Sequence, residues 1–400
     1  MKRLIQVKVI LFIVVLCGCG SQKKTAGSHD ELLQTINKNF SDASAQYKVM
    51  MTKLPANRFP KTYTAENDSV ETSNSGWWCS GFYPGSLLYL YEQTKDQSLL
   101  AEAERILNVL EKEKNNKSTH DLGFMMFCSF GNAERFASKP GYKEILVTSA
   151  KSLSTRFNPK VGCIKSWDSK PDDFLVIIDN MMNLELLFWA TRVSGDSSFY
   201  KIAVTHANTT IKNHFRPDYS SYHVVNYNPE TGEVKQKRTA QGAADESAWA
   251  RGQAWGLYGF AVTYRETKDR KYLDQANHIA EFLLHHPNLP EDKIPFWDFN
   301  APGIPNALRD ASAAAIICSA LIELSGYVNE SEKKEYLSVV QTILKNLSGP
   351  IYKADAGTNG GFILKHCVGH MPNKTEVDVP LTYADYYFIE AMKRFKELKK

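Results

Sequence analysis

The chain has 400 residues, of which 43% are hydrophobic and 23% are charged, so it can bury a sizeable core and is neither disordered nor fibrous. Its formal net charge of +4 falls further when the basic residues of the first 18 positions are removed, which excludes a basic nucleic-acid-binding surface. Aromatic residues are abundant, with 20 Phe, 7 Trp and 19 Tyr. They suffice for stacking walls in a cleft as well as for a core.

Residues 1–18 have the features of a secretory signal peptide. Lys2 and Arg3 precede an apolar run over residues 9–16 that is too short to span a bilayer. The run ends in Leu-Cys-Gly-Cys, which resembles the lipobox of a bacterial lipoprotein with Cys19 as the lipidated residue. An ordinary signal peptide cleaved nearby is the alternative. We expect a lipid-anchored protein of the bacterial cell envelope that faces the periplasm, with a polar tether over residues 19–29.

The remainder, residues 30–400, is expected to form a single domain. Amphipathic stretches predict twelve helices, and two interludes, 222–239 and 351–369, have the pattern of β-hairpins. Six helix pairs predict an all-α fold, an (α/α)6 barrel or six-hairpin toroid with two short β-hairpin insertions. The predicted helices span 30–51, 80–94, 97–116, 122–137, 140–156, 180–193, 197–214, 249–267, 270–286, 310–327, 331–347 and 380–398.

Unusual polar and aromatic residues precede every second predicted helix. If alternate helices form an inner ring and run in the same direction, these segments meet at one rim. Each acidic residue there could be an ordinary N-cap, but six segments that recur with every second helix and also contain Trp and Arg favour a shared cleft. Helix N-termini around a cleft also attract an anionic ligand such as a carboxylate. The segments are 77–85, 120–121, 178–180, 245–255, 309–310 and 380–385.

Common catalytic motifs do not occur in the sequence, which has no GxSxG, HExxH, GxxxxGK[ST] or GxGxxG. His366 and His370 lie in a predicted loop without a nearby acidic ligand, so we expect neither a metal nor a cofactor. The five cysteines after Cys19 have no CxxC pair and predict no disulfide framework. What remains is Asp, His, Gln, Arg and Trp, the residues that carbohydrate enzymes use for proton transfer, hydroxyl recognition and sugar stacking.

Five motifs, in order along the chain, resemble those of the unsaturated glucuronyl hydrolases, glycoside hydrolase family 88. The resemblance extends from about residue 30 to the C-terminus. The sister family of unsaturated rhamnogalacturonyl hydrolases, family 105, shares the six-hairpin barrel, but the Gly-Phe-Tyr-Pro-Gly and Ile-Ile-Asp-Asn stretches look like family 88. The motifs cover residues 80–86, 120–124, 178–184, 244–255 and 383–387.

The resemblance implies an exo-acting enzyme that removes a 4,5-unsaturated uronic acid from the non-reducing end of oligosaccharides made by polysaccharide lyases. Such enzymes hydrate a vinyl ether: an aspartic acid protonates C4, water adds at C5, and the hemiketal opens and expels the sugar chain. The displacement template of ordinary glycosidases therefore does not apply. By motif, Asp179 matches the general acid and base, and Asp121 its essential companion. The matching substrate-binding positions are Trp78, His120, Trp167, His223, Gln241, Arg251 and Trp255.

Two tryptophans near these motifs need a separate assignment. Trp77 is the alternative to Trp78 as the stacking residue, and we expect Trp249 to lie in the core. Asp179 must be protonated part of the time near neutral pH, although a helix N-terminus favours its charged form. We therefore expect burial, Asp121 and the substrate carboxylate to raise its pKa together.

The implied substrates are fragments of heparin or heparan, chondroitin or hyaluronan. Some family members carry a Ser-and-Lys sulfate cluster in the loop before the last helix, whereas here residues 370–376 read His-Met-Pro-Asn-Lys-Thr-Glu. This departure argues against that sulfate pocket, although Lys374 and His370 could serve a differently sulfated heparin fragment. A family 105-like hydrolase of pectic fragments and a glycan-binding lipoprotein without catalysis are the alternatives. Retention of Asp121 and Asp179 argues against the second.

Overall fold

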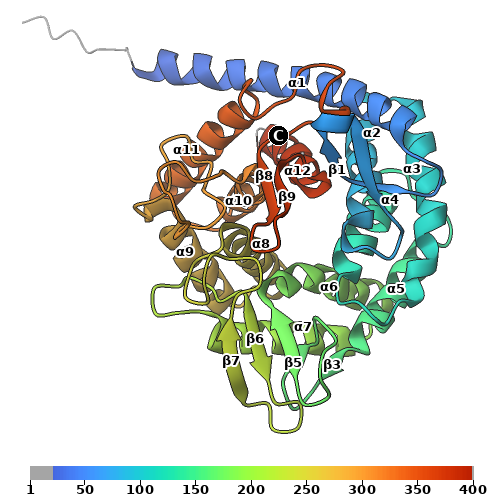
Figure 1. Cartoon of the computed structure of the whole chain (residues 1–400), viewed down its shortest axis with the longest axis vertical. Helices are drawn as coiled ribbons and strands as arrows, with labels where there is room; N and C mark the ends of the chain where they lie inside the picture. Colours follow the sequence, from blue (N-terminus) through green and yellow to red (C-terminus); the bar gives the residue numbers. More distant parts are fainter. Residues whose placement is uncertain (1–20, 399–400) are drawn as a thin grey trace, which may run out of the picture.

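The helices of the chain form a closed double ring (Figure 1). The computed structural model describes residues 21–398, and within residues 21–29 only the helical path of the backbone. Each predicted helical range overlaps one α-helix. The α-helices are α1 (Ser21–Lys53), α2 (Phe82–Thr94), α3 (Gln97–Leu110), α4 (Asn132–Phe136), α5 (Tyr142–Ser154), α6 (Leu184–Ser194), α7 (Ser197–His214), α8 (Ala250–Thr267), α9 (Arg270–His285), α10 (Ala311–Leu324), α11 (Glu330–Leu347) and α12 (Thr382–Glu397).

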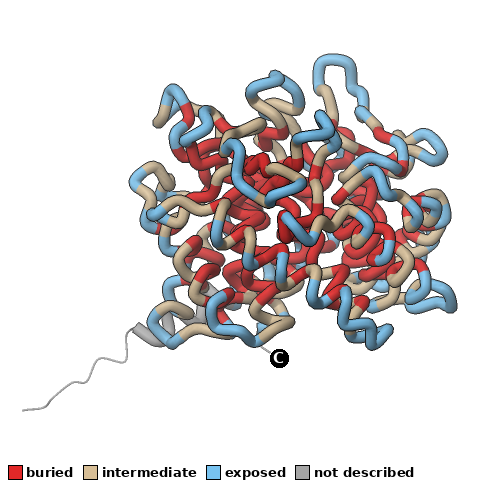
Figure 2. Tube along the Cα trace, turned by 90° about the horizontal axis from the view of Figure 1, so that it is seen from below, coloured by how far each residue is buried: buried red, intermediate tan, exposed pale blue. Residues whose placement is uncertain are grey.

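Alternate helices form the inner ring. Along it α2, α4 with the π-helix before it, α6, α8, α10 and α12 each contact the next, and α12 contacts α2 again. Neighbours cover the inner helices on most sides, and α8 is buried without interruption over residues 250–263. The outer α3 instead buries one stripe, from Leu99 to Leu110. Figure 2 shows the buried residues gathered in the middle of the molecule. The predicted (α/α)6 barrel is therefore confirmed.

Short segments of non-α helix precede three of the inner helices. They are the 3-10 helix η2 (Trp78–Gly81), the π-helix η4 (Gly123–Gly131) and the 3-10 helix η5 (Ile178–Asn183). A Cβ atom on Gly81 would lie 2.1 Å from the Phe124 carbonyl oxygen, and one on Gly123 would lie 2.4 Å from the Asn183 Cα. Only glycine allows the backbones to approach this closely. The residues at the starts of these segments are thereby drawn to one end of the ring.

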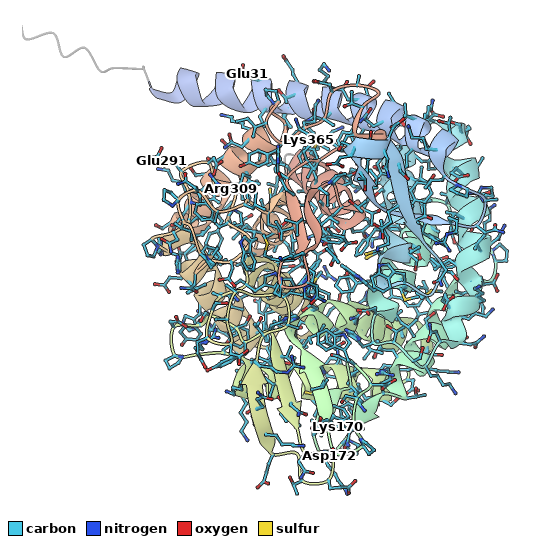
Figure 3. The ribbon with its side chains drawn as sticks, in the orientation of Figure 1. Glu31, Lys170, Asp172, Glu291, Arg309 and Lys365 are labelled. Carbon is cyan, nitrogen blue, oxygen red and sulfur yellow. The ribbon has the colours of Figure 1, made fainter. Side chains whose placement is uncertain are left out.

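Four small antiparallel sheets are attached to the barrel in the described residues. The predicted hairpin at 222–239 is confirmed, and a third strand, β5, extends it to the sheet β5-β6-β7. Lys170 and Asp172 mark the outer tip of this sheet in Figure 3. The strands are β1 (Phe59–Thr64), β2 (Ser69–Ser73), β3 (Phe157–Asn158), β4 (Cys163–Ile164), β5 (Phe174–Ile177), β6 (Val224–Tyr227), β7 (Val234–Arg238), β8 (Cys367–His370) and β9 (Thr375–Val379).

The second predicted hairpin, at 351–369, is wrong in its bounds. Only one bridge, between Lys353 and Leu364, pairs the two sides of that segment. Gly360 and Gly361 have positive φ angles and form a compact turn, so the strands do not continue to either side. The regular hairpin lies further along, where β8 pairs with β9 through residues 370–376, which the sequence had suggested as a loop.

The N-terminal predictions fall largely outside the described residues, because the signal peptide and Cys19 precede residue 21. Helix α1 begins at Ser21, and the tether expected over residues 19–29 stays a prediction. No helix of the described part of the chain is both long and apolar enough to cross a membrane.

Candidate active site

A small pocket, with about 400 Å³ of empty space that includes the part open to solvent, lies at the end of the barrel where the inner helices begin. Seven of the predicted site residues line it together with Phe124 and Ile177, which the sequence analysis missed because they read as ordinary core residues. The lining consists of Trp78, His120, Asp121, Phe124, Trp167, Ile177, Asp179, Gln241 and Arg251.

Asp179 is the second residue of η5 and is 8% exposed. Its Oδ1 atom is buried without a hydrogen-bond partner in the structure. Burial raises the pKa of Asp179 to about 7; the Arg251 charge opposes this rise, and the Asp121 charge adds to it. A carboxyl group with this pKa is both proton donor and proton acceptor near neutral pH. Burial thus contributes more than the neighbouring carboxylate, which the sequence analysis had placed beside it.

Asp121 lies two residues before η4 and shares the pocket with Asp179. Its Oδ2 accepts a hydrogen bond of 3.1 Å from the Thr119 hydroxyl. Burial raises the pKa of Asp121 to about 7, although the Thr119 hydrogen bond and the Arg156 charge lower it in part. Thr119 was missed from the sequence, although its spacing of two residues from Asp121 is typical of a local hydroxyl turn.

Two neutral histidines accompany the two carboxyls. Burial lowers the pKa of His120 to about 3, and burial also lowers the pKa of His223 far below its usual value. The His223 Nδ1 atom accepts hydrogen bonds from the Ala240 and Gln241 backbone N–H groups, at 3.1 and 3.2 Å. Its proton is therefore on Nε2, which faces the Asp179 Oδ1 atom at 3.6 Å. The His223 side chain lies behind the residues that line the pocket, and its Nε2–H group points toward the Asp179 carboxyl.

Aromatic rings form the walls. Trp78 packs against Tyr383 and Phe124, with ring centroids 4.9 and 5.5 Å apart, and Trp167 meets the His223 ring edge-on at 5.8 Å. Trp77 does not line the pocket and is 43% exposed, so Trp78 is the wall residue of the two.

Two further tryptophans lie behind these walls. Trp255 is fully buried behind Phe124, and its interaction with Asp179 lowers the pKa of that carboxyl in part. Trp249 is 2% exposed, as expected of a core residue, and its ring lies 4.5 Å from the His223 ring.

Arg251 and Gln241 line the pocket and also hold its edge in place. The Arg251 guanidinium pairs with Asp310 at 3.1 Å and donates to the Gly369 carbonyl oxygen at 2.7 Å, and the Gln241 amide donates to the same oxygen at 2.9 Å. Asp310 is fully buried, so removal of Arg251 would leave its charge uncompensated. Arg251 therefore stabilises β8 as well as the charge balance of the pocket. Asp310 was among the residues expected at the rim, but its pairing with Arg251 was not predicted.

The two histidines at positions 366 and 370 do not face a common point. His366 contacts Asp378 at 2.7 Å, whereas the His370 ring accepts a hydrogen bond from the Asn373 N–H group. In the described residues no group of three or more His, Cys, Asp or Glu side chains has the arrangement of a metal site.

Comparisons with known proteins identify the family of the chain. The profile of Glycosyl Hydrolase Family 88 matches residues 51–396. An unsaturated glucuronyl hydrolase of Formosa agariphila is 44% identical over 100% of this chain and 99% of its own length. An unsaturated chondroitin disaccharide hydrolase of Streptococcus pneumoniae is 32% identical over 84% of this chain and 86% of its own.

Solved structures are similar over nearly the whole fold. A crystal structure described as an unsaturated glucuronyl hydrolase specific for heparin superimposes with a TM-score of 0.88, at 46% identity over 92% of this chain and 98% of that one. The unsaturated glucuronyl hydrolase of Streptococcus agalactiae gives a TM-score of 0.85, at 30% identity over 91% and 92%. The family profile, the relatives and the fold agree, and the chain is a glycoside hydrolase that belongs to glycosyl hydrolase family 88.

Proposed function

We propose that this enzyme removes a 4,5-unsaturated uronic acid from the non-reducing end of oligosaccharides that polysaccharide lyases have produced. The observation that carries the proposal is the pair of largely buried carboxyls, Asp121 and Asp179, each with a pKa near 7 in one small aromatic pocket. Such a pocket accepts the end of a chain and provides a proton at neutral pH. Relatives with the name unsaturated glucuronyl hydrolase, at 44% and 32% identity, support the reaction class.

The first step is protonation of the vinyl ether. Asp179 in its acid form transfers its proton to C4 of the unsaturated ring, and positive charge develops at C5 and the ring oxygen. The carboxylate that forms on Asp179 lies 3.6 Å from the His223 Nε2–H group, which stabilises it. Asp121 influences this step through its charge, because an anion nearby holds the proton of Asp179 until it is transferred.

The second step is addition of water. Asp179, now a carboxylate, accepts a proton from the water whose oxygen bonds to C5, so the residue returns to its acid form. The C5 hemiketal then opens to a ketone by breaking its bond to the ring oxygen. The hemiacetal left at C1 collapses to an aldehyde and releases the remaining sugar chain as an alcohol. The overall reaction consumes one water molecule and requires no cofactor.

Glycosaminoglycan fragments are the substrates that we propose, with heparin or heparan fragments foremost. The support is the similarity, at 46% identity, to a protein whose structure is described as specific for heparin. Relatives at 32% identity are named for chondroitin disaccharides, so chondroitin and hyaluronan fragments belong in the test. Membership of family 88 favours these over pectic fragments.

The test is a panel of unsaturated disaccharides from heparin or heparan, chondroitin and hyaluronan, sulfated and unsulfated, with a pectic fragment as the control. Hydrolysis removes the conjugated double bond, so ultraviolet absorbance falls with time. In heavy water the product should carry one solvent deuteron at C4. Turnover of the pectic fragment alone would support a family 105-like activity, and a product without deuterium at C4 would contradict the hydration mechanism.

We also propose that the enzyme is anchored by a lipid on Cys19 in the bacterial envelope and faces the periplasm, where it acts after lyases. The support is the Leu-Cys-Gly-Cys sequence at residues 16–19. A Cys19→Ser variant should move from the membrane fraction to the soluble fraction. An unmodified N-terminus in the membrane-bound wild type would contradict the proposal.

A further inference from the structure

An exposed tryptophan stands beside the pocket. Trp77 immediately precedes η2 and is 43% exposed, whereas its neighbour Trp78 forms the pocket wall. It is the one tryptophan among the large hydrophobic residues that are exposed in the described part of the chain. Core packing does not account for this tryptophan, because its indole ring is open to solvent next to the pocket.

The turn that carries Trp77 is anchored. The Trp77 backbone N–H donates to the Asn74 carbonyl oxygen at 3.3 Å, and the Gly76 N–H donates to the Asn74 side chain at 3.0 Å. The Ser75 hydroxyl donates to the buried Glu113 carboxylate at 2.6 Å, and Asn116 donates to the other oxygen of Glu113. The exposed ring therefore projects from a backbone that is already ordered, which reduces the entropy cost of binding.

Lys61 holds the Trp77 ring from one side. Its ammonium group, on β1, lies 5.3 Å from the centre of the ring and 2.6 Å from the Glu71 carboxylate. A cation at this distance interacts with the face of the indole. Burial and the Glu71 hydrogen bond act on the pKa of Lys61 in opposite directions, and the net shift is upward, so the group stays charged.

The same lysine connects Trp77 to the pocket edge. Its Nζ atom lies 3.6 Å from the Glu376 carboxylate of β9. Glu376 in turn lies against Gly369, where an added Cβ atom would be 2.5 Å from the Glu376 Oε2 atom. The Gly369 carbonyl oxygen is the acceptor shared by Arg251 and Gln241 of the pocket. Trp77 and Lys61 are thus part of the rim that continues from the pocket lining.

From this rim we propose that Trp77 forms the binding subsite for the sugar on the reducing side of the scissile bond. The pocket is small and takes only the terminal uronic acid, so the next sugar lies outside its mouth. The face of a pyranose ring carries C–H groups that stack on an indole. Lys61 is a positioning residue that orients the Trp77 indole ring. The inference rests on the proposed function, since it assigns the second sugar of that substrate.

The experiment compares two substrates that share the unsaturated uronic acid. One is the unsaturated disaccharide that the wild type hydrolyses best, and the other is the methyl glycoside of the same acid, which has no second sugar. Trp77→Ala should raise KM for the disaccharide by about 3–10-fold, leave kcat within about twofold, and leave KM for the methyl glycoside unchanged. Lys61→Met should raise the disaccharide KM by a smaller factor, and Trp77→Tyr should restore part of the loss.

The matched control is Tyr200→Ala, which removes another exposed aromatic residue, 36% exposed, from the outer helix α7. It should change neither KM. An unchanged disaccharide KM in Trp77→Ala, or an equal rise for both substrates, would overturn the subsite. If the wild type hydrolyses neither substrate, the proposed function itself fails, and that outcome is distinct because it is seen without any variant.

Discussion

Buried acidic side chains lie at both ends of the inner helical ring, and their partners differ. At the end where the helices begin, Asp121 and Asp179 face the pocket without an ion pair to lysine or arginine in the described structure. At the opposite end, Glu323 of α10 accepts hydrogen bonds from Arg265 of α8 at 3.1 Å and from Arg394 of α12 at 2.6 Å.

The partners reverse the direction of the pKa shift. Burial acts on Glu323 as well, but the Arg265 and Arg394 charges outweigh it and hold the pKa of Glu323 below its ordinary value. The pKa of Asp179, with no such partner, rises to about 7. A larger hollow, of about 930 Å³, lies at the paired end. Its size does not make it the active site, because Arg265 and Arg394 hold Glu323 in its charged form, whereas proton transfer needs a carboxyl that changes state near neutral pH.

The largest effect that this comparison predicts is on Asp179. Asp179→Asn should fold and bind substrate but lose at least about 100-fold in kcat, because an amide cannot protonate C4. Steady-state kinetics on the best disaccharide measure the loss. Glu323→Gln is the control from the opposite end, with an expected kcat within about threefold of the wild type. Undiminished kcat in Asp179→Asn would contradict the assigned role.

Asp121 tests whether the two carboxyls are coupled. Asp121→Asn should reduce kcat strongly, and it should also move the alkaline limb of the residual pH profile to lower pH. The reason is that the like charge which helps to raise the pKa of Asp179 is removed. The wild-type kcat should fall as pH rises through about 7, because Asp179 then loses its proton. An alkaline limb that stays in place would show that burial alone sets this pKa.

At the paired end the expected effect is on stability. Glu323→Gln should lower the free energy of unfolding by about 2–3 kcal/mol, since charged hydrogen bonds to Arg265 and Arg394 are lost. Urea denaturation at neutral pH measures the change. If the variant is as stable as the wild type, the Arg–Glu network contributes nothing net, as is known for some buried ion pairs.

The smallest expected effect is a gain in stability in the catalytic variant. The pKa of Asp179 is higher in the folded than in the unfolded chain, so its contribution to stability is complete below about pH 4 and is lost as pH rises through 7. The asparagine side chain does not ionise, so the variant does not lose stability as pH rises through 7. Asp179→Asn should therefore exceed the wild type in stability at pH 8, on the order of 2 kcal/mol, and by less at pH 5. Equal differences at both pH values would contradict the raised pKa.

The sequence predicted the helices and their pairing because the 3.6-residue period of apolar positions is a local property. The outer α3 and α9 bury one stripe each, whereas the inner α10 is mostly apolar and buried from Ala311 to Ile322, so the alternation of the two kinds already distinguishes the rings. The β8–β9 hairpin was misplaced because β8 is held by hydrogen bonds with Arg251 and Asp310, which are distant from it in sequence.

The sequence by itself determined which residues are available for chemistry: the segments at 77–85, 120–121, 178–180 and 245–255 and their order along the chain. Tertiary structure decided which of two adjacent tryptophans, Trp77 and Trp78, lines the pocket, because the turn into η2 buries only one of them. It also decided that Arg251 pairs with Asp310, and that burial, more than the neighbouring charge, sets the pKa of Asp179. Burial and long-range pairing depend on segments that are far apart in sequence, so no local pattern encodes them.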